Sequence, residues 1–497
     1  MGKRRDDIVA EQRVQIALEV LSPHRTWGSI THLQRTYGLS RQGIYDIAAK
    51  GAHFLRAGMK PGVHGPQSNR RRVTVNRNRL QRSVLALTEA GASQRSVVAC
   101  LAEVLDTRVS LGWVNGQLAQ LETAAARINQ QWQPAGNETL SGDEMFANGQ
   151  PNLLIVGNES LYIYALTRQE ERDGDTWGCL LLDAPASDQF ASDAGTGLAA
   201  GVKEAEIETH QLDWDHLLRP MWGQVARLEK RAYAALQKVE ERADKFDQAY
   251  TPQRLQQHLH KWEQLSEQAE EKINQLDTFY PIAREVDNWF ALVNLETGKL
   301  SNAEQGRCRL RALGQQLEAL SGRIYHKLAK NLQNWAAGLF SYQPALQQAL
   351  APLQNEYGQK AIAALSRLWQ CEADEKRRRL SLPEQQKRQQ IWQQSLDKAL
   401  TLLGEARLWS AWEALCPVLE RSWRGSMLAE CVNSLLRPVL DRRKHTDQGC
   451  LEMFRFLHNA RPFLRGKRAG NSPAQIAGLD VPNDPFALLG LLPKVSS

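Results

Sequence analysis

The sequence contains 497 residues, of which 42% are apolar and 24% are charged, as is ordinary for proteins with folded cores. This length is sufficient for about three or four domains, and no stretch approaches the roughly eighteen uninterrupted apolar residues that a membrane-spanning helix needs. The seven cysteines are scattered and form no Cys-x-x-Cys pair, which disfavours a disulfide framework and a zinc site.

Positive charge is concentrated in two parts of the chain. Residues 1–137 contain 19 Lys and Arg against 9 Asp and Glu, a net charge of +10, whereas the whole chain carries +7. Residues 437–468 contain nine basic and three acidic residues, a net charge of +6. Such regions favour a phosphate backbone as the partner. The first residues lack the apolar core of a signal peptide, so we expect a cytosolic protein with no membrane partner.

Apolar residues at helical spacing predict a first helix over residues 8–21. Residues 26–51 then have the pattern of a helix-turn-helix, with a turn at Gly38 and Ser40 as the N-cap of the second helix. This second helix would lie in a DNA major groove, although a plain helical hairpin with solvated polar side chains is the alternative. The side chains expected to contact DNA are Arg41, Gln42 and Tyr45.

Residues 56–78 are dominated by Gly, Pro, His and Arg without any hydrophobic period, which predicts a flexible basic linker. Its run Arg70, Arg71 and Arg72 is expected to contact the DNA backbone or minor groove; a solvated hinge is the alternative. Residues 83–122 repeat the earlier pattern, with Ser93 and Ser110 as helix caps, and predict a second helix-turn-helix. Two such modules can read a longer site than either alone.

The central part of the chain predicts a mixed sheet. Residues 139–146 read as a strand with Asp143 in its middle, and Gly142 lets backbone or a ligand come close. Residues 153–156 and 160–166 read as a hairpin with a turn at Gly157 and Asn158. A helix over 173–182, a strand that stops at Asp193, another helix and a strand over 207–214 follow. This order of elements matches an RNase H-like fold.

A later segment, residues 425–445, predicts a helix that carries a third carboxylate. Glu430, Asn433 and Arg437 fall at spacings of three and four and therefore share one helix face. Residues 139–215 together with 420–480 resemble the catalytic domain of DDE-class bacterial insertion-sequence transposases, and residues 455–479 resemble their C-terminal signature.

The resemblance implies an RNase H-like core in which Asp143, Asp193 and Glu430 are the catalytic residues and hold two Mg²⁺ or Mn²⁺ ions. It also implies double-stranded DNA as the partner, both transposon ends and target, a homodimer or higher oligomer on that DNA, and a place in the bacterial cytoplasm at the nucleoid. Asn433, Arg437, Arg442, Arg443 and Lys444 are expected to contact DNA. His216 resembles a His that recurs in related enzymes, although a helix-start histidine is an equal interpretation.

The chemistry supports the same residues independently of the family. Two divalent ions about 4 Å apart can activate an oxygen nucleophile and stabilise the leaving oxygen of a phosphodiester, and such hard ions prefer carboxylate ligands. Glu144 is a rival to Asp143, but adjacent strand residues face opposite ways. Asp188 starts its strand rather than ending it. Caps or surface positions are expected for Asp183 and Asp213, and core packing for Trp177.

Residues 221–420 read as amphipathic helices punctuated by prolines, which predicts an all-helical insertion rather than one coiled coil. The predicted fold class is therefore multidomain, with all-α helix-turn-helix modules, an α/β RNase H-like core and an all-α insertion. For the insertion, the alternative to a functional role is an inert spacer bundle. The expected boundaries are 1–56 and 79–130 for the two modules, 57–78 for the linker, 138–220 and 421–480 for the core, 221–420 for the insertion and 481–497 for the tail.

The sequence favours a DDE transposase that binds terminal repeats and catalyses metal-dependent strand cleavage and strand transfer, with two alternatives. The first alternative is a DNA-binding regulator derived from such an enzyme that lacks cleavage. The second alternative is a structural helical protein whose carboxylates lie merely on the surface.

Overall fold

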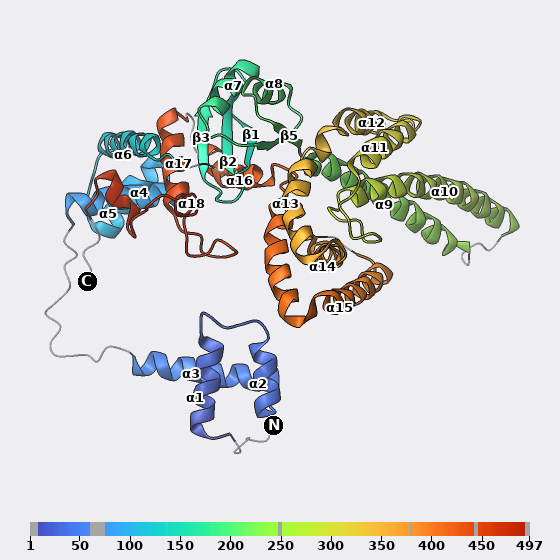
Figure 1. Ribbon diagram of the computed structural model, residues 1–497, viewed down its shortest axis with the longest axis horizontal. Helices are drawn as coiled ribbons and strands as arrows, with labels where there is room; N and C mark the ends of the chain where they lie inside the picture. The colour runs from blue at the N-terminus through green and yellow to red at the C-terminus, as the bar shows by residue number, and fades with distance from the viewer. Residues whose placement is uncertain are drawn as a thin grey trace. The chain divides into compact units, whose positions relative to one another are not determined.

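The computed structural model describes residues 8–59, 75–134, 136, 138–246, 251–377, 380–441 and 446–492. It is mostly helical, with one small mixed sheet (Figure 1). Contacts divide the chain into two compact units, Met1–Thr74 and Val75–Ser497, and the division falls inside the predicted linker. No helix in the described part of the chain has the length and apolar character required to cross a membrane.

The first unit contains three helices around a small apolar core. Helices α1 (Ala10–Leu21), α2 (Ser29–Tyr37) and α3 (Arg41–Gly58) bury Ile16, Leu33 and Ile44. Gly38 adopts a left-handed conformation (φ 62°) at the end of α2, and Ser40 accepts a hydrogen bond from the Gly43 amide at the start of α3. The predicted helix, turn and cap are confirmed.

The second unit begins with helices α4 (Arg77–Glu89), α5 (Gln94–Leu105) and α6 (Leu111–Gln131). The predicted caps are present, because Ser93 accepts from Ser96 N and Ser110 accepts from Trp113 N. The apolar face of α6 continues to Ile128, which packs in the same core as the sheet. These helices therefore belong to the same compact unit as the sheet and pack against it.

The sheet has five strands in the order β3-β2-β1-β4-β5. Strands β1, β2 and β3 pair antiparallel, whereas β4 pairs parallel to β1 and β5 pairs parallel to β4. Every predicted strand is present, although β2 starts earlier and β5 is shorter than expected. The bounds are β1 Leu140–Ala147, β2 Gln150–Gly157, β3 Ile163–Arg168, β4 Gln189–Ser192 and β5 Thr209–Leu212.

Helices cover both faces of the sheet because alternate strand residues point to opposite sides. Leu153 and Ile155 of β2 pack with helices α7 (Gly174–Leu182) and α8 (Thr196–Glu204). Leu154 packs on the other face with α16 (Met427–Asp441). Residues from far apart in the sequence thus form one three-layered core.

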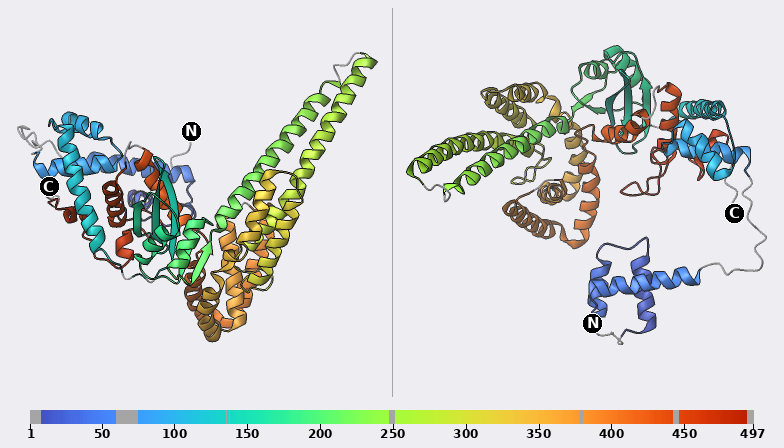
Figure 2. Two further views of the ribbon diagram at one scale, coloured as in Figure 1. Left: turned by 90° about the horizontal axis from the view of Figure 1, so that it is seen from above. Right: turned by 180° about the vertical axis from the view of Figure 1, so that it is seen from behind.

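The segment between the two parts of this core is helical, as predicted, with two apolar cores of its own. Helices α9 (Trp214–Ala243) and α10 (Pro252–Trp289) form a long antiparallel pair (Figure 2, left). The prolines at 252, 344 and 383 start helices, but Pro281 lies inside α10 and Pro352 lies inside α13 (Gln343–Tyr357), where the sequence pattern predicted helix ends. The helices are α9 Trp214–Ala243, α10 Pro252–Trp289, α11 Ala303–Glu318, α12 Arg323–Trp335, α13 Gln343–Tyr357, α14 Gln359–Arg377 and α15 Leu382–Glu420.

The chain returns to the sheet through α16 and ends along α6. Helix α9 runs through residue 220, where the sequence suggested a boundary, so the core and the insertion share one continuous helix. Asn129 of α6 donates to the Glu452 carbonyl at 2.9 Å, and Arg82 of α4 pairs with Asp484. The remaining elements are α17 (Gln448–Ala460), α18 (Pro473–Ile476) and the 3-10 helices η2 (Gly338–Phe340) and η3 (Pro485–Leu489).

Gly142 makes room for a core side chain rather than for a ligand. A Cβ at this position would lie 2.3 Å from Cζ of Phe190, which is fully buried. We expect Gly142→Ala to lower the free energy of unfolding by about 1–3 kcal/mol, because the ring must move within a packed core. Thermal denaturation measures this change. The matched control is Gly116→Ala on α6, where no atom lies within 4 Å of the added methyl group, and it should be neutral or stabilising.

Candidate active site

Three aspartates form one row: Asp143 lies on β1, and Asp193 and Asp213 directly follow the parallel strands β4 and β5. Ser141 pairs with Ala191, and Ser192 pairs with Leu212, so the same register carried forward places Asp143, Asp193 and Asp213 side by side. The Asp213 amide donates to the Ser192 carbonyl at 2.9 Å, which extends the pairing of β4 with β5 to Asp213. Two of the carboxylates contact the α16 region, because Asp143 accepts from Asn433 of α16 and Asp213 accepts from Ser426 just before α16.

Asp143 is held by two hydrogen bonds. Its Oδ2 accepts from Asn433 Nδ2 of α16 at 2.8 Å, and its Oδ1 accepts from the Glu144 amide at 2.8 Å. Burial, together with the negative charge of Asp193, raises the pKa of Asp143 to about 6, although both hydrogen bonds act to lower it. A positive charge placed between these two carboxylates would favour their ionised forms.

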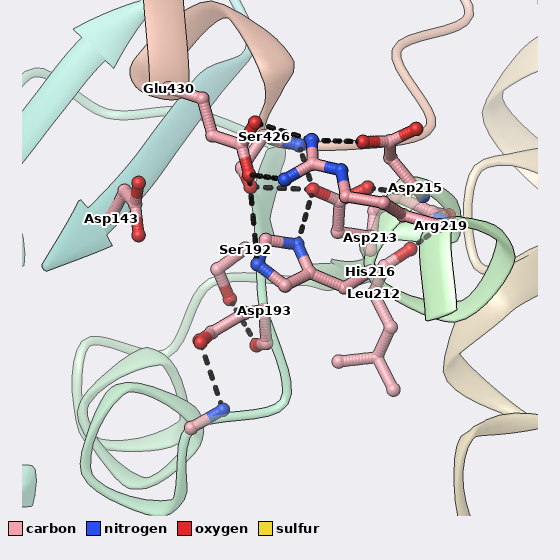
Figure 3. Close-up of polar contacts among 12 residues, drawn as sticks. Asp143, Ser192, Asp193, Leu212, Asp213, Asp215, His216, Arg219, Ser426 and Glu430 are labelled. Carbon is pink, nitrogen blue, oxygen red and sulfur yellow. Dashed lines mark hydrogen bonds and ion pairs between the residues drawn. The ribbon is translucent and has the colours of Figure 1, made fainter. Parts of the chain in front are cut away.

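Glu430 reaches the same region from the first turn of α16 (Figure 3). Arg219 of α9 holds it with a two-pronged contact, in which Nη1 lies 3.2 Å from Oε1 and Nη2 lies 2.7 Å from Oε2. Arg219 also contacts Asp215, one turn earlier on its own helix. His216 Nε2 lies 3.7 Å from Glu430 Oε1. The Glu430 carboxylate is therefore surrounded by cationic groups of α9.

Asp213 fastens the start of α9 to the start of α16. Its side chain is fully buried and accepts from the Ser426 amide at 3.0 Å, from Ser426 Oγ at 2.7 Å and from His216 Nδ1 at 2.9 Å. Burial alone would raise its pKa, but the hydrogen bonds from His216 and Ser426 outweigh this effect and the pKa is lowered. The hydrogen bond to Asp213 in turn raises the pKa of His216 to about 9, so the imidazole is positively charged at neutral pH.

The Asp193 side chain turns toward the start of α8. Its Oδ1 accepts from the Gly195 amide at 3.0 Å. Just before it, Ser192 Oγ shares a 2.7 Å hydrogen bond with His210 Nε2, and burial lowers the pKa of this histidine. Figure 3 shows Asp143, Asp193 and Glu430 around one space. Within the described residues, however, no three His, Cys, Asp or Glu side chains converge closely enough to hold a metal ion.

The carboxylates that the sequence analysis did not assign as metal ligands lie in the predicted positions. Glu144 faces the opposite side of the sheet, where it pairs with Arg172 at 2.7 Å and accepts from Trp177 Nε1 at 3.1 Å. Trp177 is fully buried, as expected for a core residue. Asp183 caps the end of α7. Asp213 is indeed the N-cap of α9, but the sequence missed that it also belongs to the site.

The residues predicted to contact DNA fall into three groups. Arg41, Gln42 and Tyr45 are exposed on α3, and Arg437 is exposed on α16. Asn433 is instead buried and bonded to Asp143, so in this structure it orients a carboxylate rather than facing solvent. The others lie outside the described residues: Arg70, Arg71, Arg72, Arg442, Arg443 and Lys444.

Arg219 and Ser426 contact the site carboxylates Glu430 and Asp213, although neither residue was predicted from the sequence. The signal for Arg219 was present, because Asp215 and Arg219 are four residues apart and so share a face of α9. Nothing local signals Ser426, since its partner Asp213 is 213 positions earlier in the chain. No protein-family model matches the sequence, and a search of curated proteins finds no match. A functional conclusion therefore depends on the geometry of the site.

Proposed function

We propose that this protein is a DNA transposase of the DDE class, which binds transposon ends and catalyses metal-dependent strand cleavage and strand transfer. One observation carries the proposal: Asp143 on β1, Asp193 directly after the parallel strand β4, and Glu430 from beyond the helical insertion lie around one region (Figure 3). The strand order β3-β2-β1-β4-β5, antiparallel in its first three strands and parallel in the rest, supports an RNase H-like core.

The donor set fits hard divalent ions. Asp143, Asp193 and Glu430 offer carboxylate oxygens, which Mg²⁺ and Mn²⁺ prefer. Burial and, to a smaller extent, the negative charge of Asp193 raise the pKa of Asp143, so a bound cation would stabilise its ionised form. A bound pair of such ions supplies an activated oxygen nucleophile and stabilises the leaving oxygen. The described residues hold no converged metal-binding group, so Asp193, Glu430 and Asp143 would hold the ions only after the Asp193 and Glu430 side chains turn from their present partners.

The chain's own residues prepare this site. Asn433 fixes the rotation of the Asp143 carboxylate from α16. His216, kept protonated by Asp213, presents a positive charge beside Glu430, where the anionic phosphodiester would be bound. Because the Asp213 contacts hold α9 against α16, these groups are positioned before DNA arrives.

Two surfaces support duplex DNA as the partner. In the first unit, α3 presents Arg41 and Tyr45 beside a hollow that is also lined by Arg25, His32 and Arg35. In the second unit, the loop after α17 exposes three basic side chains and is braced by Arg468, whose Nε donates to the Glu159 carbonyl at 2.6 Å. The exposed side chains of that loop are Arg461, Arg465 and Lys467. An oligomer on DNA would bring two ends together.

A strand-cleavage assay tests the proposal. The substrate is a duplex that carries the DNA flanking the coding region, incubated with the full chain and Mg²⁺ or Mn²⁺. We expect cleavage in the presence of the ion, none with a chelator, and a loss of at least about 1,000-fold, or about 4 kcal/mol of barrier, in Asp193→Ala. Tight, salt-sensitive binding of the duplex without ion-dependent cleavage would instead identify a DNA-binding regulator.

A further inference from the structure

Arg219 engages both oxygens of the carboxylate that the proposed function assigns to a metal ion. Its Nη1 and Nη2 lie 3.2 and 2.7 Å from Oε1 and Oε2 of Glu430, the parallel geometry in which guanidinium and carboxylate match best. His216 adds a second positive group 3.7 Å from Oε1. Figure 3 shows the guanidinium between Glu430 and Asp215. Both Glu430 oxygens thus face cationic side chains.

A divalent ion competes with this arrangement. An ion bound by Glu430 would share an oxygen that Arg219 now contacts, and the ion and the guanidinium repel each other at such short range. This repulsion favours withdrawal of Arg219 when Glu430 acts as a ligand. The Glu430 carboxylate keeps a cationic partner through the exchange, because the divalent ion takes the place of the guanidinium.

Withdrawal of Arg219 costs little. Its side chain is 60% exposed, whereas the Glu430 side chain is 27% exposed, and ion pairs with such access to water contribute little to stability. The backbone of Arg219 stays in place, since the start of α9 is fastened by Asp213 to Ser426. The released guanidinium therefore remains tethered at the edge of the site, with Asp215 beside it on the same helix.

The best destination for this guanidinium is a phosphodiester. A guanidinium presents a planar fork of donors that fits two phosphate oxygens as well as it fits a carboxylate. A phosphodiester bound between the three carboxylates lies within the region that Arg219 borders. Arg219 would then exchange one anionic partner for another.

We propose that Arg219 is the resident counter-ion of Glu430, that it yields this carboxylate to the divalent ion, and that it then binds the phosphate of the DNA strand to be cut. This inference rests on the proposed function and deepens it. It makes ion binding depend on DNA: without DNA, Arg219 competes with the ion, and with DNA it has another partner. By linkage, the ion must strengthen DNA binding by the same factor.

The test measures the affinity of the full chain for Mn²⁺ alone, by the electron paramagnetic resonance signal of the free ion, with and without the flanking-DNA duplex. In the natural protein we expect DNA to tighten Mn²⁺ binding by about 5-fold or more. Without DNA, we expect Arg219→Gln to bind Mn²⁺ about 5-fold more tightly than the natural protein does. The factor by which DNA tightens Mn²⁺ binding should be correspondingly smaller in this variant. Arg219→Lys keeps the positive charge but lacks the planar pair of donors of a guanidinium. In this variant the lysine should still compete with Mn²⁺ for Glu430, and DNA should tighten Mn²⁺ binding less than in the natural protein but more than in Arg219→Gln.

The matched control is Arg309→Gln. Arg309 on α11 makes a comparable two-pronged pair with Glu285 of α10, and its side chain is 42% exposed. This variant loses an equivalent ion pair and should leave both Mn²⁺ affinities unchanged. Asp143→Asn should weaken Mn²⁺ binding in every background, which locates the ion at the proposed site.

The inference is overturned if Arg219→Gln binds Mn²⁺ no more tightly than the natural protein without DNA, or if neither protein binds the ion. It is also overturned if DNA tightens Mn²⁺ binding equally in both. A different outcome separates the two proposals. If Arg219→Gln binds Mn²⁺ more tightly but the natural protein does not cleave DNA, the competition between Arg219 and the ion at Glu430 stands. The proposed function as a transposase is then wrong.

Discussion

Asp143→Asn is expected to abolish metal-dependent DNA cleavage, with a loss of at least about 1,000-fold in rate, while leaving the fold intact. The substitution removes the charge of the carboxylate that stands beside Asp193 in the register of the sheet. The new amide keeps one oxygen, which can accept from Asn433, but its NH2 group cannot accept from the Glu144 amide. Because burial opposes ionisation of Asp143, the loss of the charge offsets the loss of this hydrogen bond, and the thermal midpoint should change little. Cleavage rates and thermal denaturation are measured on the same preparations.

Glu144→Gln is the control for this prediction. Glu144 is the next residue on the same strand but faces the other side of the sheet, where it pairs with the largely exposed Arg172. Its oxygen contact with Trp177 can be kept by a glutamine, and the lost ion pair contributes no more than about 1 kcal/mol. The variant should cleave DNA at the natural rate. Equal losses in both variants would mean that Asp143 matters for the sheet and not for chemistry.

Asp213→Ala is expected to destabilise the second unit by about 3 kcal/mol, which is the scale for breaking a buried, hydrogen-bonded charge pair. The substitution leaves the Ser426 amide and hydroxyl without their acceptor and deprives His216 of its carboxylate. The starts of α9 and α16, which lie far apart in the sequence, then lose the hydrogen bonds that join them. Calorimetry should show a lower thermal midpoint, and hydrogen exchange should quicken at the Ser426 amide.

Asp215→Ala is the matched comparison for Asp213→Ala. Asp215 lies on the same helical turn, its side chain is 25% exposed, and its ion pair is with the exposed Arg219. We expect a change in stability of no more than about 1 kcal/mol and unchanged exchange at Ser426. If the two variants lose the same stability, Asp213 is an ordinary helix cap and does not hold α9 against α16.

The features of the fold that depend on a few neighbouring residues could be predicted from the sequence. The caps at Ser40, Ser93 and Ser110 are of this kind, because each hydrogen bond spans three residues. The strands were recognisable from short apolar runs with turn residues between them. Pro281 shows the limit of such signals: the tertiary packing of α10 against α9 keeps the helix continuous where the local pattern indicates a break.

The candidate site was only partly predictable. The position of Asp193 at a strand end was visible, and the spacing of Glu430 and Asn433 on one helix face was correct. The row formed by Asp143, Asp193 and Asp213 was not visible, because strand register depends on pairing between segments that the sequence does not align. The same reason hid the Arg219 contact, since it joins a helix before the insertion to a helix after it.

The direct test of the central claim is a crystal structure of the full chain with Mn²⁺ and a flanking-DNA duplex, in which anomalous scattering locates the ions. We expect Mn²⁺ between Asp143 and its two partners Asp193 and Glu430, with two sites about 4 Å apart. A complex that cleaves DNA in solution but binds Mn²⁺ away from Asp143 and Asp193, with no ion at Glu430, would contradict the shared metal site.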